Sequence, residues 1–135
     1  MKNKPYLIFL SMSMMIFYSG CDESSSSITG SENVNEITNV TFLNIVTSIT
    51  ENSLKATGVI KNNSQSLSIS APWYIECQFY YNDSLGNTFL IGGASERVNN
   101  TLLPGISLQW TLSYGIENPE AFQNFAINDL RAYKN

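Results

Sequence analysis

The segment from Trp73 to Tyr81 limits the fold more than any other part of this chain. Apolar and polar side chains alternate along it without interruption, which is the period of a strand with one buried face. The side chains expected to point inward are Trp73, Ile75, Cys77, Phe79 and Tyr81. Those expected to point outward are Tyr74, Glu76, Gln78 and Tyr80. A helix would mix the two sets around its axis, so the segment predicts the central strand of a β-structure.

Shorter segments of the same kind occur on both sides of this strand, separated by turn residues. Further strands are expected over residues 40–49, 53–60, 88–91, 94–100, 107–114 and 125–130. The alternation slips once in the first of them, which predicts a β-bulge, and the last is expected to be irregular near Asn128 and Asp129. Residues 37–135 are therefore predicted to form one all-β, antiparallel sandwich of about seven strands.

Two breaks in the strand pattern carry their own predictions. Gly92 and Gly93 follow the short strand 88–91 and are expected to end it, with a polar edge strand beyond them. Asn118, Pro119 and Glu120 have the order of an N-cap, a first-turn proline and an early acid, which predicts one helical turn over 118–123.

The N-terminal segment has the composition of an export signal. Lys2 and Lys4 precede an uncharged, apolar run that ends at Tyr18, and the small residues Ser19 and Gly20 stand directly before Cys21. This site resembles a bacterial lipobox, so residues 1–20 are predicted to be a cleaved lipoprotein signal peptide and Cys21 to be lipidated. An ordinary secretory signal and a retained anchor stay as alternatives, although the run is shorter than the ~20 apolar residues that span a bilayer.

Residues 21–36 are predicted to be a flexible tether. The stretch after Cys21 is acidic and rich in serine, with no apolar residue from Asp22 to Ser27 and little apolar character up to Glu36. A spacer of this kind would hold a folded domain off a membrane. We therefore expect a lipid-anchored protein on the extracytoplasmic side of the cell membrane, either periplasmic or on the outer surface.

Charge excludes some classes of partner. Without Lys2 and Lys4, five of the seven basic residues remain against all 11 acids, a formal charge of −6. Nucleic acid demands a basic surface, so it is not an expected partner, and docking on anionic lipid through a basic patch is disfavoured as well. With Cys21 used for the anchor, Cys77 is predicted to be buried and unpaired.

The sequence offers no residues for catalysis or metal binding. It contains no histidine, which removes the commonest general base and the commonest metal ligand. The polar cluster of residues 82–87 has too few alternating carboxylates for a calcium loop and predicts a β-turn. Glu117 and Glu120 fit the first turn of a short helix better than a pair of catalytic acids. We expect no enzyme activity, no metal and no cofactor.

Three sequence segments carry a resemblance to a known family. Residues 58–62 (Gly-Val-Ile-Lys-Asn), residues 79–83 (Phe-Tyr-Tyr-Asn-Asp) with Gly86 beyond them, and Leu103-Pro104-Gly105 before an alternating strand are similar to FxLYD domains. The resemblance covers about residues 38–133. It implies an immunoglobulin-like sandwich behind a tether in a bacterial lipoprotein or membrane-anchored protein, and it implies no catalytic residue or ligand.

The outward face of the central strand is the predicted interaction site. Tyr74 and Tyr80 beside Glu76 and Gln78 would offer the aromatic and polar side chains that are enriched at protein interfaces. The expected function is a non-catalytic, protein-interaction or cell-envelope accessory module with an unknown envelope protein as its partner. The alternative is a small-ligand or glycan-binding lipoprotein in which Trp73 or Trp110 is an exposed stacking platform.

Overall fold

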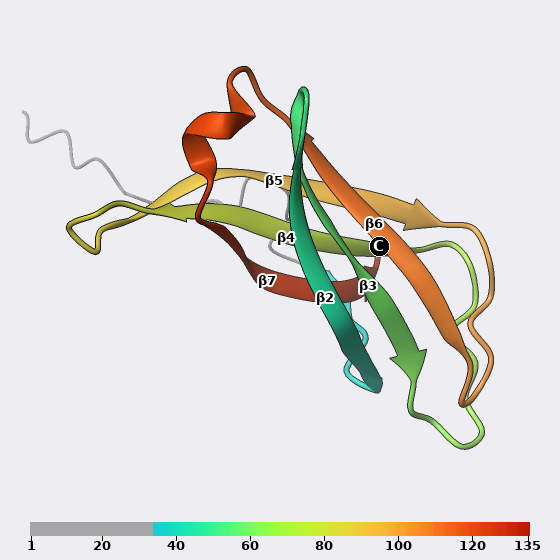
Figure 1. Ribbon diagram of the computed structural model, residues 1–135. Coiled ribbons are helices and arrows are strands. Elements are labelled where there is room, and N and C mark those ends of the chain that lie inside the picture. Colours follow the sequence, from blue (N-terminus) through green and yellow to red (C-terminus); the bar gives the residue numbers. More distant parts are fainter. Residues whose placement is uncertain (1–33) are drawn as a thin grey trace, which may run out of the picture.

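The fold is an antiparallel β-sandwich of two sheets, as the sequence predicts. A computed structural model describes residues 34–135, and Figure 1 shows its two layers, with the strands of one sheet crossing those of the other. The strands are β1 Asn35–Glu36, β2 Val40–Thr50, β3 Ser53–Asn62, β4 Trp73–Asn82, β5 Thr88–Val98, β6 Ser107–Gly115 and β7 Phe125–Lys134. The four-stranded sheet has the order β1-β7-β4-β5 and the three-stranded sheet the order β2-β3-β6.

The predicted inward faces form the core between the sheets. In β4, Trp73, Ile75, Cys77 and Phe79 are fully buried. Side chains from the facing sheet close the interior, namely Leu54, Ala56, Ile60, Trp110 and Leu112. The phenyl ring of Phe79 contacts Tyr114 and Phe125 at ring-centroid distances of 6.0 and 5.9 Å. Burial of this apolar surface is the main stabilising term of the fold.

The predicted irregularities of β2 and β7 are present. The register between β2 and β3 shifts between Leu43 and Val46, where Asn44 has φ 53°. Asp129 has the same φ, 53°, where the register between β4 and β7 shifts. Asparagine and aspartate tolerate this left-handed conformation better than most residues, so each stands where an extra residue must be accommodated.

The prediction that Gly92 and Gly93 end a strand is wrong. Strand β5 runs through both glycines. A Cβ atom at Gly92 would lie 2.2 Å from Cζ of Tyr114, so the missing side chain makes room for a tyrosine from the opposite sheet. Glycine marks a close approach between sheets here, which is the other common reason for a glycine inside a strand.

Two boundaries also differ from expectation. Strand β1 pairs with β7, Asn35 opposite Lys134 and Glu36 opposite Tyr133, so the sheet begins two residues inside the predicted tether. The signal peptide and Cys21 lie outside the described residues. The predicted helical turn is a 3-10 turn, η1 (Pro119–Phe122), and Asn118 precedes it with φ 60° and no capping hydrogen bond from its side chain.

Two loops at one end of the sandwich are joined by a buried asparagine. Asn62 is fully buried, and its Nδ2 donates to the carbonyl oxygens of Leu67, at 2.8 Å, and Leu102, at 3.1 Å. Its Oδ1 accepts from the backbone N–H of Ser64 at 3.0 Å. These bonds satisfy the buried side-chain amide of Asn62, and they join residues 63–72 to residues 99–106. Both loops lie at the lower right of Figure 1.

Candidate functional site on the outer face of the four-stranded sheet

The structure places the four predicted interaction residues together on the outer face of β4, but it buries two of them. Tyr74 and Tyr80 are half-buried, whereas Glu76 is 2 % exposed and Gln78 is 7 % exposed. The prediction that all four side chains face solvent is therefore wrong for Glu76 and Gln78. Alternation correctly assigns the face of the sheet, but it does not report which neighbouring side chains cover that face.

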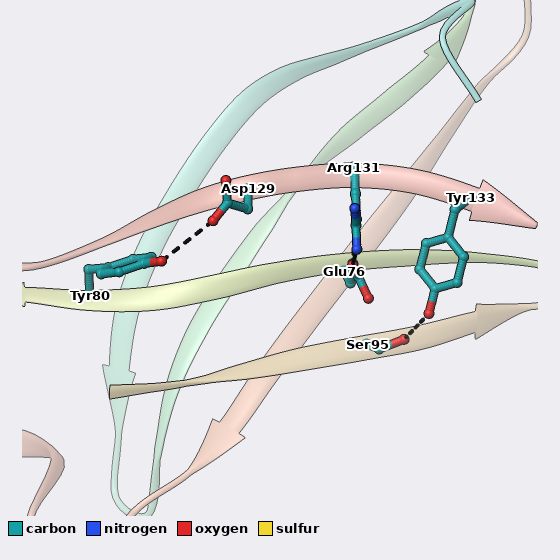
Figure 2. Close-up of polar contacts among 6 residues, drawn as sticks. All are labelled: Glu76, Tyr80, Ser95, Asp129, Arg131 and Tyr133. Atoms are coloured by element: carbon teal, nitrogen blue, oxygen red, sulfur yellow. Dashed lines mark hydrogen bonds and ion pairs between the residues drawn. The ribbon is translucent and has the colours of Figure 1, made fainter. Parts of the chain in front are cut away.

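Arg131 on β7 covers Glu76. Its Nε donates to Oε1 of Glu76 at 2.5 Å, and its Nη2 forms an ion pair with the same oxygen, as Figure 2 shows. Within residues 34–135 the other carboxylate oxygen, Oε2, has no hydrogen-bond partner. Register explains the pairing, because Glu76 lies directly opposite Arg131 in the β4–β7 ladder.

Two tyrosines extend this ion pair into a stack. The rings of Tyr74 and Tyr133 lie 5.3 Å apart and nearly parallel, and the guanidinium of Arg131 lies 5.8 Å from the centroid of Tyr133. The hydroxyl of Tyr133 reaches across β4 to the hydroxyl of Ser95 on β5, 3.4 Å away. Each side chain is held by its neighbours, so the middle of this face is pre-organised.

Tyr80 marks the other end of the face. Its hydroxyl donates to Oε1 of Gln78, and it lies 3.5 Å from Oδ2 of Asp129. Loss of hydration, followed by the nearby charge of Asp129, raises the pKa of the Tyr80 phenol. The phenol is therefore neutral at physiological pH and keeps a proton to donate.

A shallow cleft of about 290 Å³ lies beside the ion pair. It is lined by Glu36, Glu76, Gln78, Asp129, Leu130 and Arg131. Three carboxylates and one guanidinium make the lining acidic. In the described part of the chain no group of three or more acids, cysteines or histidines is placed to hold a metal ion.

Cys77 lies under this face, in the core, and it is a free, buried cysteine as predicted. Burial, followed by the charge of Glu76, raises the pKa of its thiol to about 12. A thiol that stays protonated at neutral pH is a poor nucleophile and packs as a small apolar side chain.

Neither tryptophan is an exposed platform. Trp73 is fully buried and its Nε1 donates to the carbonyl oxygen of Asn100 at 2.9 Å. Trp110 is 4 % exposed, and its ring lies against Gly58, where a Cβ atom would come within 2.8 Å of Cζ2. The stacking-platform form of the ligand-binding alternative is therefore wrong.

The sequence reasoning missed Arg131, Tyr133 and Ser95 as members of this face. Arg131 and Tyr133 do stand two apart, on either side of the buried Ala132, which is the outward pattern of a strand. Their position beside β4 depends on the order of strands in the sheet, and that order follows from pairing between distant segments.

No family model, curated protein or solved structure matches this chain. Among residues 34–135 there is also no helix long and apolar enough to cross a membrane.

Proposed function

We propose that this protein is a lipid-anchored, extracytoplasmic and non-catalytic module of a bacterial envelope that binds another envelope protein. The observation that carries the binding role is the pair of half-buried side chains Tyr74 and Arg131 on the sheet face, which the buried Tyr133, 6 % exposed, and the buried Glu76 hold in place. Tyrosine and arginine are the residues that most often anchor protein interfaces. Because their side chains are already ordered, little conformational entropy would be lost on binding.

The surface around the stack extends the proposed contact. Leu90 on β5 is exposed and lies opposite Tyr80 on the same face, so it adds apolar area next to a hydrogen-bonding phenol. The acidic cleft beside Arg131 would favour a partner that presents a basic or hydrogen-bond-donating side chain.

The anchor is proposed from the sequence. Cys21 follows Ser19 and Gly20 after the apolar run, and 13 residues separate it from Asn35, where the sheet begins. The fully extended chain from Cys21 to Asn35 spans at most about 50 Å. The domain would therefore stay within that distance of the membrane that holds the lipid.

We also propose that the domain is a divergent relative of FxLYD domains, which would make the sandwich immunoglobulin-like. Two residues of the segment 58–62, which resembles FxLYD domains, have structural roles that restrict what could replace them. Gly58 leaves room for the ring of Trp110, and Asn62 joins the two loops at one end of the sandwich.

Site-specific photo-crosslinking in native membranes tests the binding role. A photoreactive p-benzoylphenylalanine in place of Tyr80 is expected to give one discrete crosslinked product. The same substitution of Thr111, which is exposed on β6 in the other sheet, is the matched control and is expected to give none. Tyr74→Ala in the Tyr80-labelled chain should weaken the product about tenfold, the effect of losing about 1.4 kcal/mol. Equal products at Tyr80 and Thr111 would contradict the proposed face.

The anchor has a separate prediction. The wild-type chain is expected to partition into detergent and to have an intact mass that corresponds to a diacylated or triacylated chain beginning at Cys21. Cys21→Ser is expected to lose the added mass, because serine has no thiol to receive the lipid. A wild-type chain that stays in the aqueous phase with an N-terminus elsewhere would rule the lipid anchor out.

A further inference from the structure

The described chain begins at the end of the sandwich that carries the loops 63–72 and 99–106, and we call this the tether end. Asn35 pairs with Lys134, whose Nζ donates to the hydroxyl of Ser70 at 2.6 Å. The backbone N–H of Asn63 donates to the carbonyl oxygen of Asn39 at 2.9 Å. An N-terminal attachment to a membrane would therefore hold the domain by this end.

Three exposed aliphatic side chains lie at the tether end. Leu67 is 67 % exposed, Leu103 is 55 % exposed and Ile106 is 53 % exposed. Their backbones are held close together, because Asn62 bonds to the carbonyls of Leu67 and Leu102 and its own N–H donates to the carbonyl of Ile106 at 3.0 Å. The three side chains therefore extend from two loops that hydrogen bonds hold side by side.

Charge is distributed unequally between the two ends. The tether-end loops contain no acid, and the nearest cations are Lys61 on β3, Arg97 on β5 and Lys134 on β7. The turns at the opposite end carry acids and no bases. These acids are Glu51 between β2 and β3, Asp83 between β4 and β5, and Glu117 and Glu120 between β6 and β7. The nearest acids to the tether end, Glu36 and Glu96, lie on strands.

We infer that the tether end rests on the lipid bilayer, with Leu67, Leu103 and Ile106 inserted at the boundary between headgroups and acyl chains. The inference rests on the proposed membrane attachment. Aliphatic side chains on uncharged loops suit this boundary, and two lysines beside them suit anionic headgroups. The contact is chiefly apolar, so it does not need the basic patch that the composition excludes.

The orientation places the most exposed large apolar side chain of residues 34–135 away from the bilayer. Leu85, at 84 % exposure, lies in the turn between β4 and β5 at the opposite end, together with Asp83. Leu85 is therefore a matched control. It is as apolar and at least as exposed as the tether-end residues, but it belongs to the acidic end.

Fluorescence of single labels on the full chain tests the inference. An environment-sensitive nitrobenzoxadiazole label is attached at Leu103→Cys, Ile106→Cys or Leu85→Cys, and the chain is reconstituted into vesicles of phosphatidylethanolamine and phosphatidylglycerol. The tether-end labels are expected to brighten at least about twofold and to shift to the blue, because they enter an apolar environment. The label at Leu85 is expected to keep its aqueous emission.

Two controls separate this inference from the anchor. Sedimentation with the vesicles reports attachment, and the same label comparison is repeated with the full Cys21→Ser chain held by an N-terminal hexahistidine tag on nickel-chelating lipid. Even if the wild-type chain carries no lipid, the chain held on nickel-chelating lipid shows whether the tether end contacts the bilayer. Equal emission from Leu103 and Leu85 labels on attached chains would overturn the inference. So would brightening of the Leu103 label without vesicles as protein concentration rises, since that would identify a second copy as the occupant.

Discussion

Phe79→Ala is expected to lower the free energy of unfolding by about 3–5 kcal/mol, because it empties a fully buried site between the two sheets. The phenyl ring contacts Tyr114 from the three-stranded sheet and Phe125 from β7, so both layers lose packing at once. The loss is a large share of the ~5–15 kcal/mol that holds a small domain together. Denaturant midpoints measured on residues 34–135 give the value.

Two controls make the Phe79 result specific. Thr111→Ala, exposed on β6, is expected to change the stability by less than about 0.5 kcal/mol. Gln78→Ala removes a buried hydrogen-bond acceptor of Tyr80 and is expected to cost about 1–2 kcal/mol. A Phe79→Ala loss no larger than that of Thr111→Ala would contradict the assignment of the inward face of β4.

Arg131→Met is the second large effect, with an expected loss of about 3–5 kcal/mol. Methionine retains much of the aliphatic bulk but leaves the carboxylate of Glu76, whose side chain is 3 % exposed, without a counter-charge. A buried, unpaired charge is among the most costly single defects in a folded protein. Thermal or denaturant unfolding of residues 34–135 measures it.

A double-mutant cycle shows whether the loss comes from the charge. Glu76→Gln combined with Arg131→Met removes both charges, so the pair of substitutions is expected to cost clearly less than Arg131→Met alone. Equal costs for the single and the double variant would mean that Arg131 acts through packing on Tyr133 and not through Glu76.

Much of the fold was predictable because the strands of this chain have local signatures. Alternation assigned the inward face of β4 and the slip in residues 40–49 marked the bulge at Asn44. The errors arose where a distant segment decides the outcome. Gly92 does not end β5, because Tyr114 fills the space above it. The local pattern gives Asn62, at the end of β3, no structural role, yet it is fully buried and bonds to two later loops.

The candidate site was half predictable for the same reason. The sequence identifies Tyr74, Glu76, Gln78 and Tyr80 as one face, since their period of two is a local property. It does not reveal that Arg131 pairs with Glu76, because 55 positions separate them and the β4–β7 register brings them together. Because Arg131 covers Glu76, the burial of Glu76 could not be predicted from the sequence either.

The bulge at Asn44 has a consequence for how copies of this protein behave toward one another at high concentration. Strand β2 is an outer strand, it carries no charged residue, and it exposes Ile45 and Val46. A flat edge of this composition would be a template for strand addition by a neighbouring chain. The extra residue at Asn44 twists the backbone and interrupts the row of free N–H and C=O groups. The bulge in β2 thus disfavours aggregation by edge-to-edge strand addition and favours the monomer.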